Sequence, residues 1–113
     1  MQTRATSLSC FQRAGALLFE SLRCVSCHAA GSGQRGPDLA GRFGGTAVLD
    51  DGRSVPFDES YVRTSILDPR HDLAAGYQPL MPTYAGQVNE IEVLELVAFL
   101  KSLAPAEAQE QAR

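Results

Sequence analysis

The chain has 113 residues and a net charge of −3, with 44% hydrophobic and 20% charged residues, which is the balance of one globular domain. Its arginine and lysine residues are scattered, which argues against nucleic-acid binding, and no apolar run is long enough for a membrane span. The chain contains three cysteines, an odd number, so a disulfide framework is not expected. Because it contains no tryptophan, its core needs aliphatic residues or an apolar group supplied from outside.

A first helix is predicted over residues 13–22, where apolar residues recur at helical spacing, and it is expected to run into Cys24. Residues 1–12 are interpreted as an N-terminal extension or a remnant of excision, with Cys10 as a free surface or near-terminal thiol. No apolar segment of a secretory signal is visible there. We therefore expect the chain to be a segment of a longer protein.

The sequence CVSCH follows, with Cys24 and Cys27 three apart and His28 directly after the second cysteine. This is the attachment pattern of c-type haem, in which two thiols add to the vinyl groups of one porphyrin and the histidine becomes an axial iron ligand. Zinc would need two more ligands from Cys10, His28 and His71, and no second close-spaced pair is present. A thioredoxin-type dithiol expects a βαβ setting, which this chain lacks. The pattern favours haem attachment.

Two long loops rich in glycine and proline occupy much of the chain that follows. They cover residues 29–45 and 70–88. Between them, short apolar runs flank Asp51 and Gly52, a turn dipeptide, which predicts a small β-hairpin at about 46–57. A helix is expected over residues 58–67, which begin with the capping candidate Asp58 and end before an Asp-Pro pair. Loops of this length are unusual in a compact domain unless something holds them.

The second loop contains Met81, which lies close to Pro79 and next to Pro82. A core methionine usually lies on a periodic face of an element, whereas this one lies in a stretch that the prolines stiffen. A thioether on a stiff loop suits an iron ligand that must hold its position in both redox states. His71 is the alternative sixth ligand, but thioether ligation raises the reduction potential as electron carriers require. Met81 is therefore predicted to be the second axial ligand, with His28 as the first.

The last helix has the clearest pattern. Asn89 can cap it and Glu92 follows three residues later, as in a capping box. Apolar residues then recur at helical spacing, namely Val93, Leu96, Val97 and Leu100. Pro105 is expected to end the helix, and residues 105–113 form a polar tail that is expected to fray.

The motifs follow one another along the chain in the order GALLF, CVSCH, GPDLAG, a helix ending in DP, then MP and an apolar last helix. This order resembles a class I cytochrome c domain, and the resemblance covers residues 13–103. The resemblance implies an all-α fold of three to four helices around one covalently bound haem c, with the domain at 13–104. Gly15 and Phe19 would then cross the last helix near its 96–100 segment.

The resemblance also assigns residues around the haem. The Pro37 carbonyl would accept the N–H of His28 and fix the ring. Ile66, Leu67 and Leu80 would line the haem. Small mitochondrial-type members of the family have an arginine where this chain has Gly45 and a tryptophan where it has Phe57, so the haem propionates need other partners here. The candidates are Arg63, Tyr61, Tyr77 and Arg42.

A narrower similarity concerns the runs VLDDGRSVPFDESYVRTSILDP and MPTYAGQVNEIEVLELVAFLKSL. Both are similar to the C-terminal cytochrome c domain of subunit II in caa3-type cytochrome c oxidases. This implies a respiratory-chain relay with no catalytic site of its own. Its donor would be a cytochrome c or a quinol-oxidising complex, and its acceptor would be the copper centre of the membrane-associated oxidase. Attachment of c-type haem implies the periplasm or the outer face of the cytoplasmic membrane.

Four other functions stay open. The chain could be a free periplasmic cytochrome c, or the cytochrome domain of another complex such as alternative complex III, which the full gene would distinguish. It could be a haem sensor or peroxidase-like enzyme with Met81 displaceable, which carbon monoxide binding would reveal. A zinc-binding interaction module without haem would be colourless.

Overall fold

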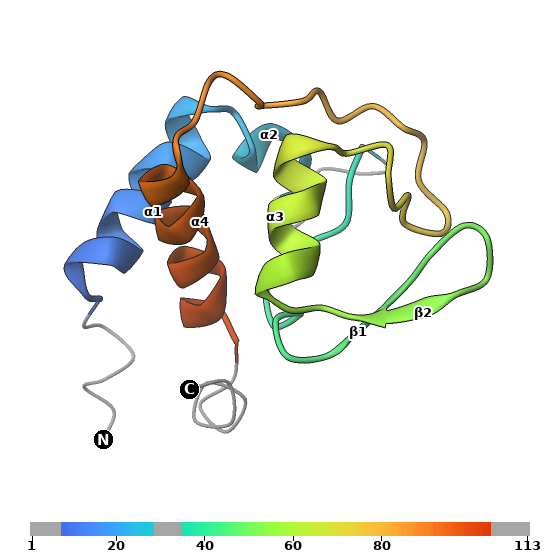
Figure 1. Cartoon of the computed structure of the whole chain (residues 1–113). Helices are drawn as coiled ribbons and strands as arrows, with labels where there is room; N and C mark the ends of the chain where they lie inside the picture. The colour runs from blue at the N-terminus through green and yellow to red at the C-terminus, as the bar shows by residue number, and fades with distance from the viewer. Residues whose placement is uncertain (1–7, 29–34, 105–113) are drawn as a thin grey trace.

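The computed structural model describes residues 8–28 and 35–104, and in these ranges it consists of four helices and one small hairpin. The elements are α1 (Cys10–Ser21), α2 (Val25–His28), β1 (Thr46–Val48), β2 (Ser54–Pro56), α3 (Glu59–Leu67) and α4 (Glu90–Ser102). Figure 1 shows α1 packed across α4, α3 standing beside α4, and the hairpin extending away from the helices. The predicted all-α fold with a small hairpin is confirmed. The predicted tail at 105–113 lies outside the described residues.

Helix α1 begins at Cys10, three residues before the predicted start, because a capping box fixes its first turn. The Ser9 hydroxyl accepts the Gln12 N–H at 3.1 Å, and the Gln12 side chain accepts the Ser9 N–H at 2.9 Å. Cys10 is exposed in this first turn. It therefore belongs to the helix rather than to an extension before it.

Helix α1 ends at Ser21, and the prediction that it runs into Cys24 was wrong. Arg23 adopts a left-handed backbone conformation with a φ of 68°. A residue in this conformation cannot continue a right-handed helix, since the carbonyl directions reverse there. The chain turns at Arg23 and restarts as the short helix α2, which begins directly after Cys24 and contains the rest of the CVSCH motif.

Helices α1 and α4 cross at Gly15, as predicted. A Cβ atom at this position would overlap the backbone carbonyl of Glu95 and would lie only 2.8 Å from the Cβ of Phe99. Without a side chain here, the two backbones come close enough for the Phe19 and Phe99 rings to meet, with their centroids 5.3 Å apart. The crossing places the end of α1, and with it the cysteine motif, beside α4.

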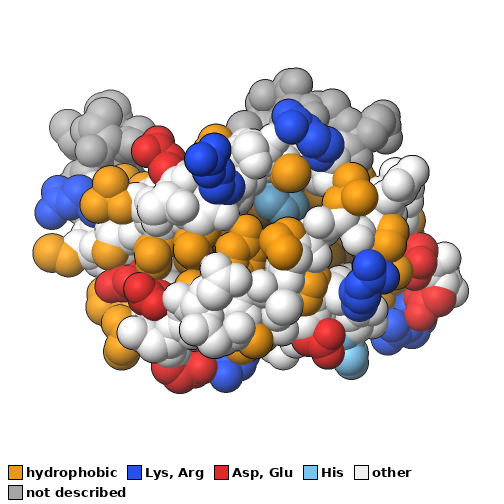
Figure 2. All heavy atoms as spheres, turned by 90° about the horizontal axis from the view of Figure 1, so that it is seen from above, with side chains coloured by type: hydrophobic (Ala, Val, Ile, Leu, Met, Phe, Trp, Pro, Cys, Tyr) orange, Lys and Arg blue, Asp and Glu red, His pale blue; other side chains and the backbone are white. Residues whose placement is uncertain are grey.

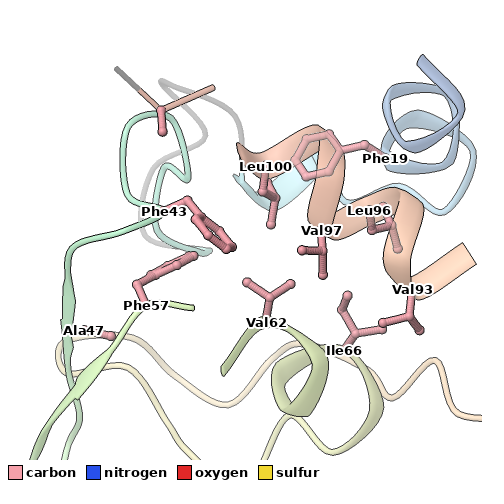
Figure 3. Packing of buried hydrophobic residues seen from close by; sticks show 11 residues of the cluster. Phe19, Phe43, Ala47, Phe57, Val62, Ile66, Val93, Leu96, Val97 and Leu100 are labelled. Carbon is pink, nitrogen blue, oxygen red and sulfur yellow. The ribbon is translucent and has the colours of Figure 1, made fainter. Parts of the chain in front are cut away.

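The core lies along the inner face of α4, as its apolar pattern predicted. Its buried residues are Val93, Leu96, Val97 and Leu100. Figure 3 shows them facing Val62 and Ile66 of α3, with Phe43 and Phe57 beyond one end. The predicted caps are also present, since Asp58 accepts the Tyr61 N–H at 2.9 Å at the start of α3, and Asn89 accepts the Glu92 N–H at 2.8 Å at the start of α4.

The predicted hairpin is confirmed, and it holds part of the second long loop. Strands β1 and β2 pair antiparallel on either side of Gly52, whose φ of 92° suits the turn. The Asp50 N–H donates to the Leu73 carbonyl at 2.8 Å, and the Arg53 guanidinium donates to Asp72 at 3.2 Å. These contacts fasten the segment after α3 to the hairpin. No helix in the described residues has both the length and the apolar character needed to cross a membrane.

Candidate cofactor site

A cavity of about 300 Å³ opens between the ends of α1 and α2, one face of α3, helix α4 and the loop that leads into α4. Its size falls in the range of small-molecule and cofactor pockets. Most of its lining is apolar, including Phe19, Leu22, Pro37, Leu39, Phe57, Val62, Ile66, Leu73, Pro79, Pro82, Leu96 and Leu100. Figure 2 shows hydrophobic side chains gathered around the hollow on this face, with basic side chains at several points around it.

One wall of the cavity carries Cys24, Cys27 and His28. The N–H groups of Cys27 and His28 both donate to the Cys24 carbonyl, at 3.1 and 2.9 Å, which closes one helical turn. Residues three and four apart on a helical turn share a face, so this turn directs both sulfur atoms and the imidazole to the same side. The spacing of the motif therefore has a direct geometric consequence.

Cys24 and Cys27 form no disulfide, and Cys24 is half-buried. Burial raises the pKa of the Cys24 thiol, and the nearby Cys27 charge raises it further, while a backbone hydrogen bond opposes both effects. Cys24 therefore stays protonated at neutral pH. This is the opposite of the low pKa that a reactive redox dithiol requires.

His28 is oriented by the chain segment that follows the motif. Its Nδ1 lies 2.8 Å from the Pro37 carbonyl oxygen, as predicted. Because a carbonyl only accepts hydrogen bonds, the proton must be on Nδ1, which leaves the Nε2 lone pair of the neutral ring available to a metal. Gly36, just before Pro37, is buried against the ring, and a Cβ there would lie 3.2 Å from Nδ1 and 3.0 Å from the Cys27 carbonyl oxygen.

Gly36→Ala is expected to disturb His28 without removing any functional group. The added methyl must push the ring or the backbone by a few tenths of an ångström, so we expect the free energy of unfolding to fall by about 1–3 kcal/mol. The NMR signals of the His28 ring should shift as well. Chemical denaturation and NMR would measure the two effects.

Gly45→Ala is the matched control, since a Cβ at Gly45 would approach only the Arg42 carbonyl, at 3.3 Å. It should leave the His28 ring signals unchanged. Unchanged ring signals in Gly36→Ala would contradict the tight contact between Gly36 and the imidazole.

Met81 lines the same cavity from the loop before α4, where it is half-buried and packs against the core. Pro79 and Pro82, the residues expected to stiffen this loop, line the cavity with it. Of the other predicted site residues, Pro37, Ile66, Tyr61 and Tyr77 also reach the lining. The structure thus brings the thiols, the imidazole and the thioether to one cavity, while their roles toward a cofactor stay predictions.

Four of the predicted residues do not reach the cavity lining. Leu80 is 55% exposed, since it follows Pro79 on a non-helical stretch and its side chain is directed to solvent. Arg63 lies off the face of α3 that lines the cavity, and its guanidinium pairs with Glu90, which lowers the pKa of that carboxyl. Leu67 and Arg42 are likewise absent from the lining.

Several lining residues were not predicted from the sequence. Arg23, Arg35, Arg70 and Asp72 contribute polar groups. Tyr84 contributes a hydroxyl that donates to the Leu22 carbonyl at 2.8 Å. No local pattern marks these positions, because each reaches the cavity through the path of the chain rather than through a motif.

The residues named for a zinc site do not form a cluster in the described part of the chain. No three histidine, cysteine, aspartate or glutamate side chains come together there in a way that could hold a metal ion. His71 is exposed, with its Nδ1 3.3 Å from Asp72. Cys10 is at the opposite end of α1 from the motif.

Comparison with known proteins gives one result that covers all the walls of the cavity. A family model described as cytochrome c matches residues 12–104. No match to a curated protein was found. The matched range runs from the first turns of α1 to the residues after α4.

Proposed function

The chain belongs to the cytochrome c family, and from this premise we propose that it is the electron relay of a caa3-type cytochrome c oxidase, with one haem c held by Cys24, Cys27, His28 and Met81. Membership of the family implies one-electron transfer by a covalently bound c-type haem. The observation that carries the ligand assignment is the single cavity that gathers the CVSCH turn, the Pro37 carbonyl and Met81.

The residues of the cavity fit a haem. One helical turn presents both sulfur atoms for thioether bonds, and His28 keeps Nε2 available while Nδ1 donates to Pro37. A soft sulfur ligand is available from Met81 on the loop before α4. When bound, the haem supplies an iron that alternates between the ferric and ferrous states.

The chain's own residues set the conditions for that exchange. The apolar lining excludes water from most of the cavity, and a low local polarity favours the less charged ferrous state. The hydrogen bond to Pro37 holds the imidazole in one orientation, so little reorganisation accompanies a change of charge. If His28 and Met81 both bound the haem iron, no position would be left for a substrate, which is why we assign the chain no catalytic site of its own.

The assignment to an oxidase is supported by the two sequence runs that are similar to the subunit II cytochrome domain. In the structure these runs form the hairpin, α3, the loop with Met81 and α4. They therefore contribute the α3, α4 and Met81 parts of the cavity lining. On this proposal the acceptor is the copper centre of subunit II and the donor is a cytochrome c or a quinol-oxidising complex. The domain would lie in the periplasm or at the outer face of the cytoplasmic membrane.

The test is to find which polypeptide carries this haem in the source cells. A covalent haem stays attached in denaturing gels, so haem staining and an antibody to this chain would identify the same band. We expect the band in the membrane fraction, at a mass larger than that of this chain, copurifying with copper and oxidase activity. A haem band of this chain's own mass in the soluble periplasmic fraction would overturn the oxidase proposal in favour of a free cytochrome c. A membrane band that copurifies with a complex without copper would favour alternative complex III.

A further inference from the structure

Tyr84 joins the loop that carries Met81 to the end of α1. Its hydroxyl donates to the Leu22 carbonyl at 2.8 Å, across 62 residues of sequence, and the bond is partly buried. Leu22 is the C-cap of α1, where helix carbonyls lose their partners within the helix. The tyrosine therefore satisfies a carbonyl two residues before Cys24.

The same short segment is also tied to the end of α3. The Tyr84 N–H donates to the Ile66 carbonyl at 3.0 Å, and the Thr83 hydroxyl donates to the Leu67 carbonyl at 2.7 Å. The Tyr84 carbonyl in turn accepts the Val88 N–H at 3.2 Å, in the turn that leads to α4. Hydrogen bonds therefore hold Tyr84 to the end of α1, to the end of α3 and to the turn before α4.

Tyr84 lies three residues after Met81. Since a chain extends at most about 3.6 Å per residue, Met81 always stays within roughly 11 Å of Tyr84, and the hydrogen bonds fix the position of Tyr84 itself. His28 belongs to the other wall, on the turn that follows the end of α1. The Tyr84–Leu22 bond is therefore a direct tie between the wall that carries Met81 and the wall that carries His28.

We propose that Tyr84 is a positioning residue that holds the Met81 loop against the end of α1 and so keeps the thioether at the iron opposite His28. The proposal rests on the ligand assignment made above, in which Met81 is the second axial ligand. Tyr84 acts through Met81 and through the spacing of the two walls. It needs no contact with the iron.

The protonation of Tyr84 suits this role. Burial raises the pKa of the phenol, and the charges of Cys24 and Cys27 raise it further. The two cysteine contributions disappear once thioethers form, while burial remains. A raised pKa means that the stabilising bond is fully present below the ordinary tyrosine pKa of about 10 and is lost only as the pH rises through the higher folded value. The hydroxyl is therefore a donor throughout the neutral range.

The test is Tyr84→Phe in the haem-loaded protein, which removes one hydroxyl and keeps the ring. Imidazole would be titrated into the ferric form while the weak far-red band of Met–Fe(III) is followed, because imidazole binds only where Met81 has moved away. Loss of a partly buried hydrogen bond should raise the open population, and with it the apparent imidazole affinity, about tenfold. Ser21→Ala is the control, since it removes a hydroxyl near the same end of α1 that donates to Leu18. It should leave the affinity unchanged.

An imidazole affinity of Tyr84→Phe within twofold of the wild type would overturn the proposal. A wild-type protein without the far-red band would overturn it differently, because Met81 would then not be the ligand and the ligand assignment itself would fail. Hydrogen exchange of the wild type provides a second measurement that does not depend on the variant. The Tyr84 amide should be protected like the core of α4, and fast exchange typical of exposed loops would contradict an anchoring role.

Discussion

Replacing Gly15 by alanine is expected to lower the free energy of unfolding by about 3 kcal/mol, although alanine favours a helix more than glycine does. Intrinsic propensity alone would stabilise α1 by about 1 kcal/mol. The added Cβ, however, would overlap the Glu95 carbonyl and lie 2.8 Å from the Phe99 Cβ, and neither group can rotate away because a carbonyl and a Cβ are fixed by the helix backbone. Separating the helices would also pull Phe19 away from Phe99. We expect the cost of overpacking to exceed the gain in propensity.

A decrease in the free energy of unfolding would therefore show that overpacking outweighs helix propensity at this position. Guanidinium denaturation of the haem-loaded protein would measure the change. Glu20→Ala is the matched control, because Glu20 is exposed on the same helix and its removal should change the free energy of unfolding by less than about 0.5 kcal/mol. A Gly15→Ala protein as stable as the wild type would show that α1 and α4 do not cross as closely as described.

The elements that the sequence predicted well are those that local signals define. Helix α4 has a capping box and four apolar residues at helical spacing, and all four are buried. The start of α1 had a similar signal in Ser9 and Gln12, but the apolar pattern used to place the helix begins later. Its end could not be predicted, since a left-handed arginine at position 23 is stabilised by the surrounding fold rather than by its own preference.

The candidate site likewise contains residues that local sequence signals predicted and residues that they did not. The CVSCH motif could be identified from its spacing alone, and the helical turn that places its side chains on one face is what the structure adds. Arg63 and Leu80 were assigned by resemblance, and neither reaches the cavity. Whether Arg63 reaches it depends on the rotation of about 100° per residue along α3. Whether Leu80 reaches it depends on the local path of the Met81 loop. The Tyr84–Leu22 bond joins residues 62 apart, and no pattern in the sequence indicates it.

Met81→Ala is expected to change the properties of the haem-loaded protein more than any other single substitution in the loop before α4. The cavity would lose its sulfur ligand while the His28 side, with its bond to Pro37, stays intact. We expect the far-red band to disappear and the reduction potential to fall by on the order of 0.2 V, within the range of about 0.8 V that axial ligands span. Carbon monoxide should bind to the ferrous variant and not to the wild type.

His71→Ala separates this prediction from its rival. His71 is exposed beside Asp72 and does not line the cavity, so removing it should leave the far-red band, the potential and the response to carbon monoxide as they are. A wild-type protein without the far-red band, whose potential and response to carbon monoxide change in His71→Ala and not in Met81→Ala, would make His71 the ligand and would require the loop after α3 to leave the hairpin that holds it at Leu73. Binding of carbon monoxide by the wild-type protein would instead mean that Met81 is displaceable. That result would favour a sensor or a peroxidase-like enzyme over an electron relay, because an open iron position admits ligands that a filled one excludes.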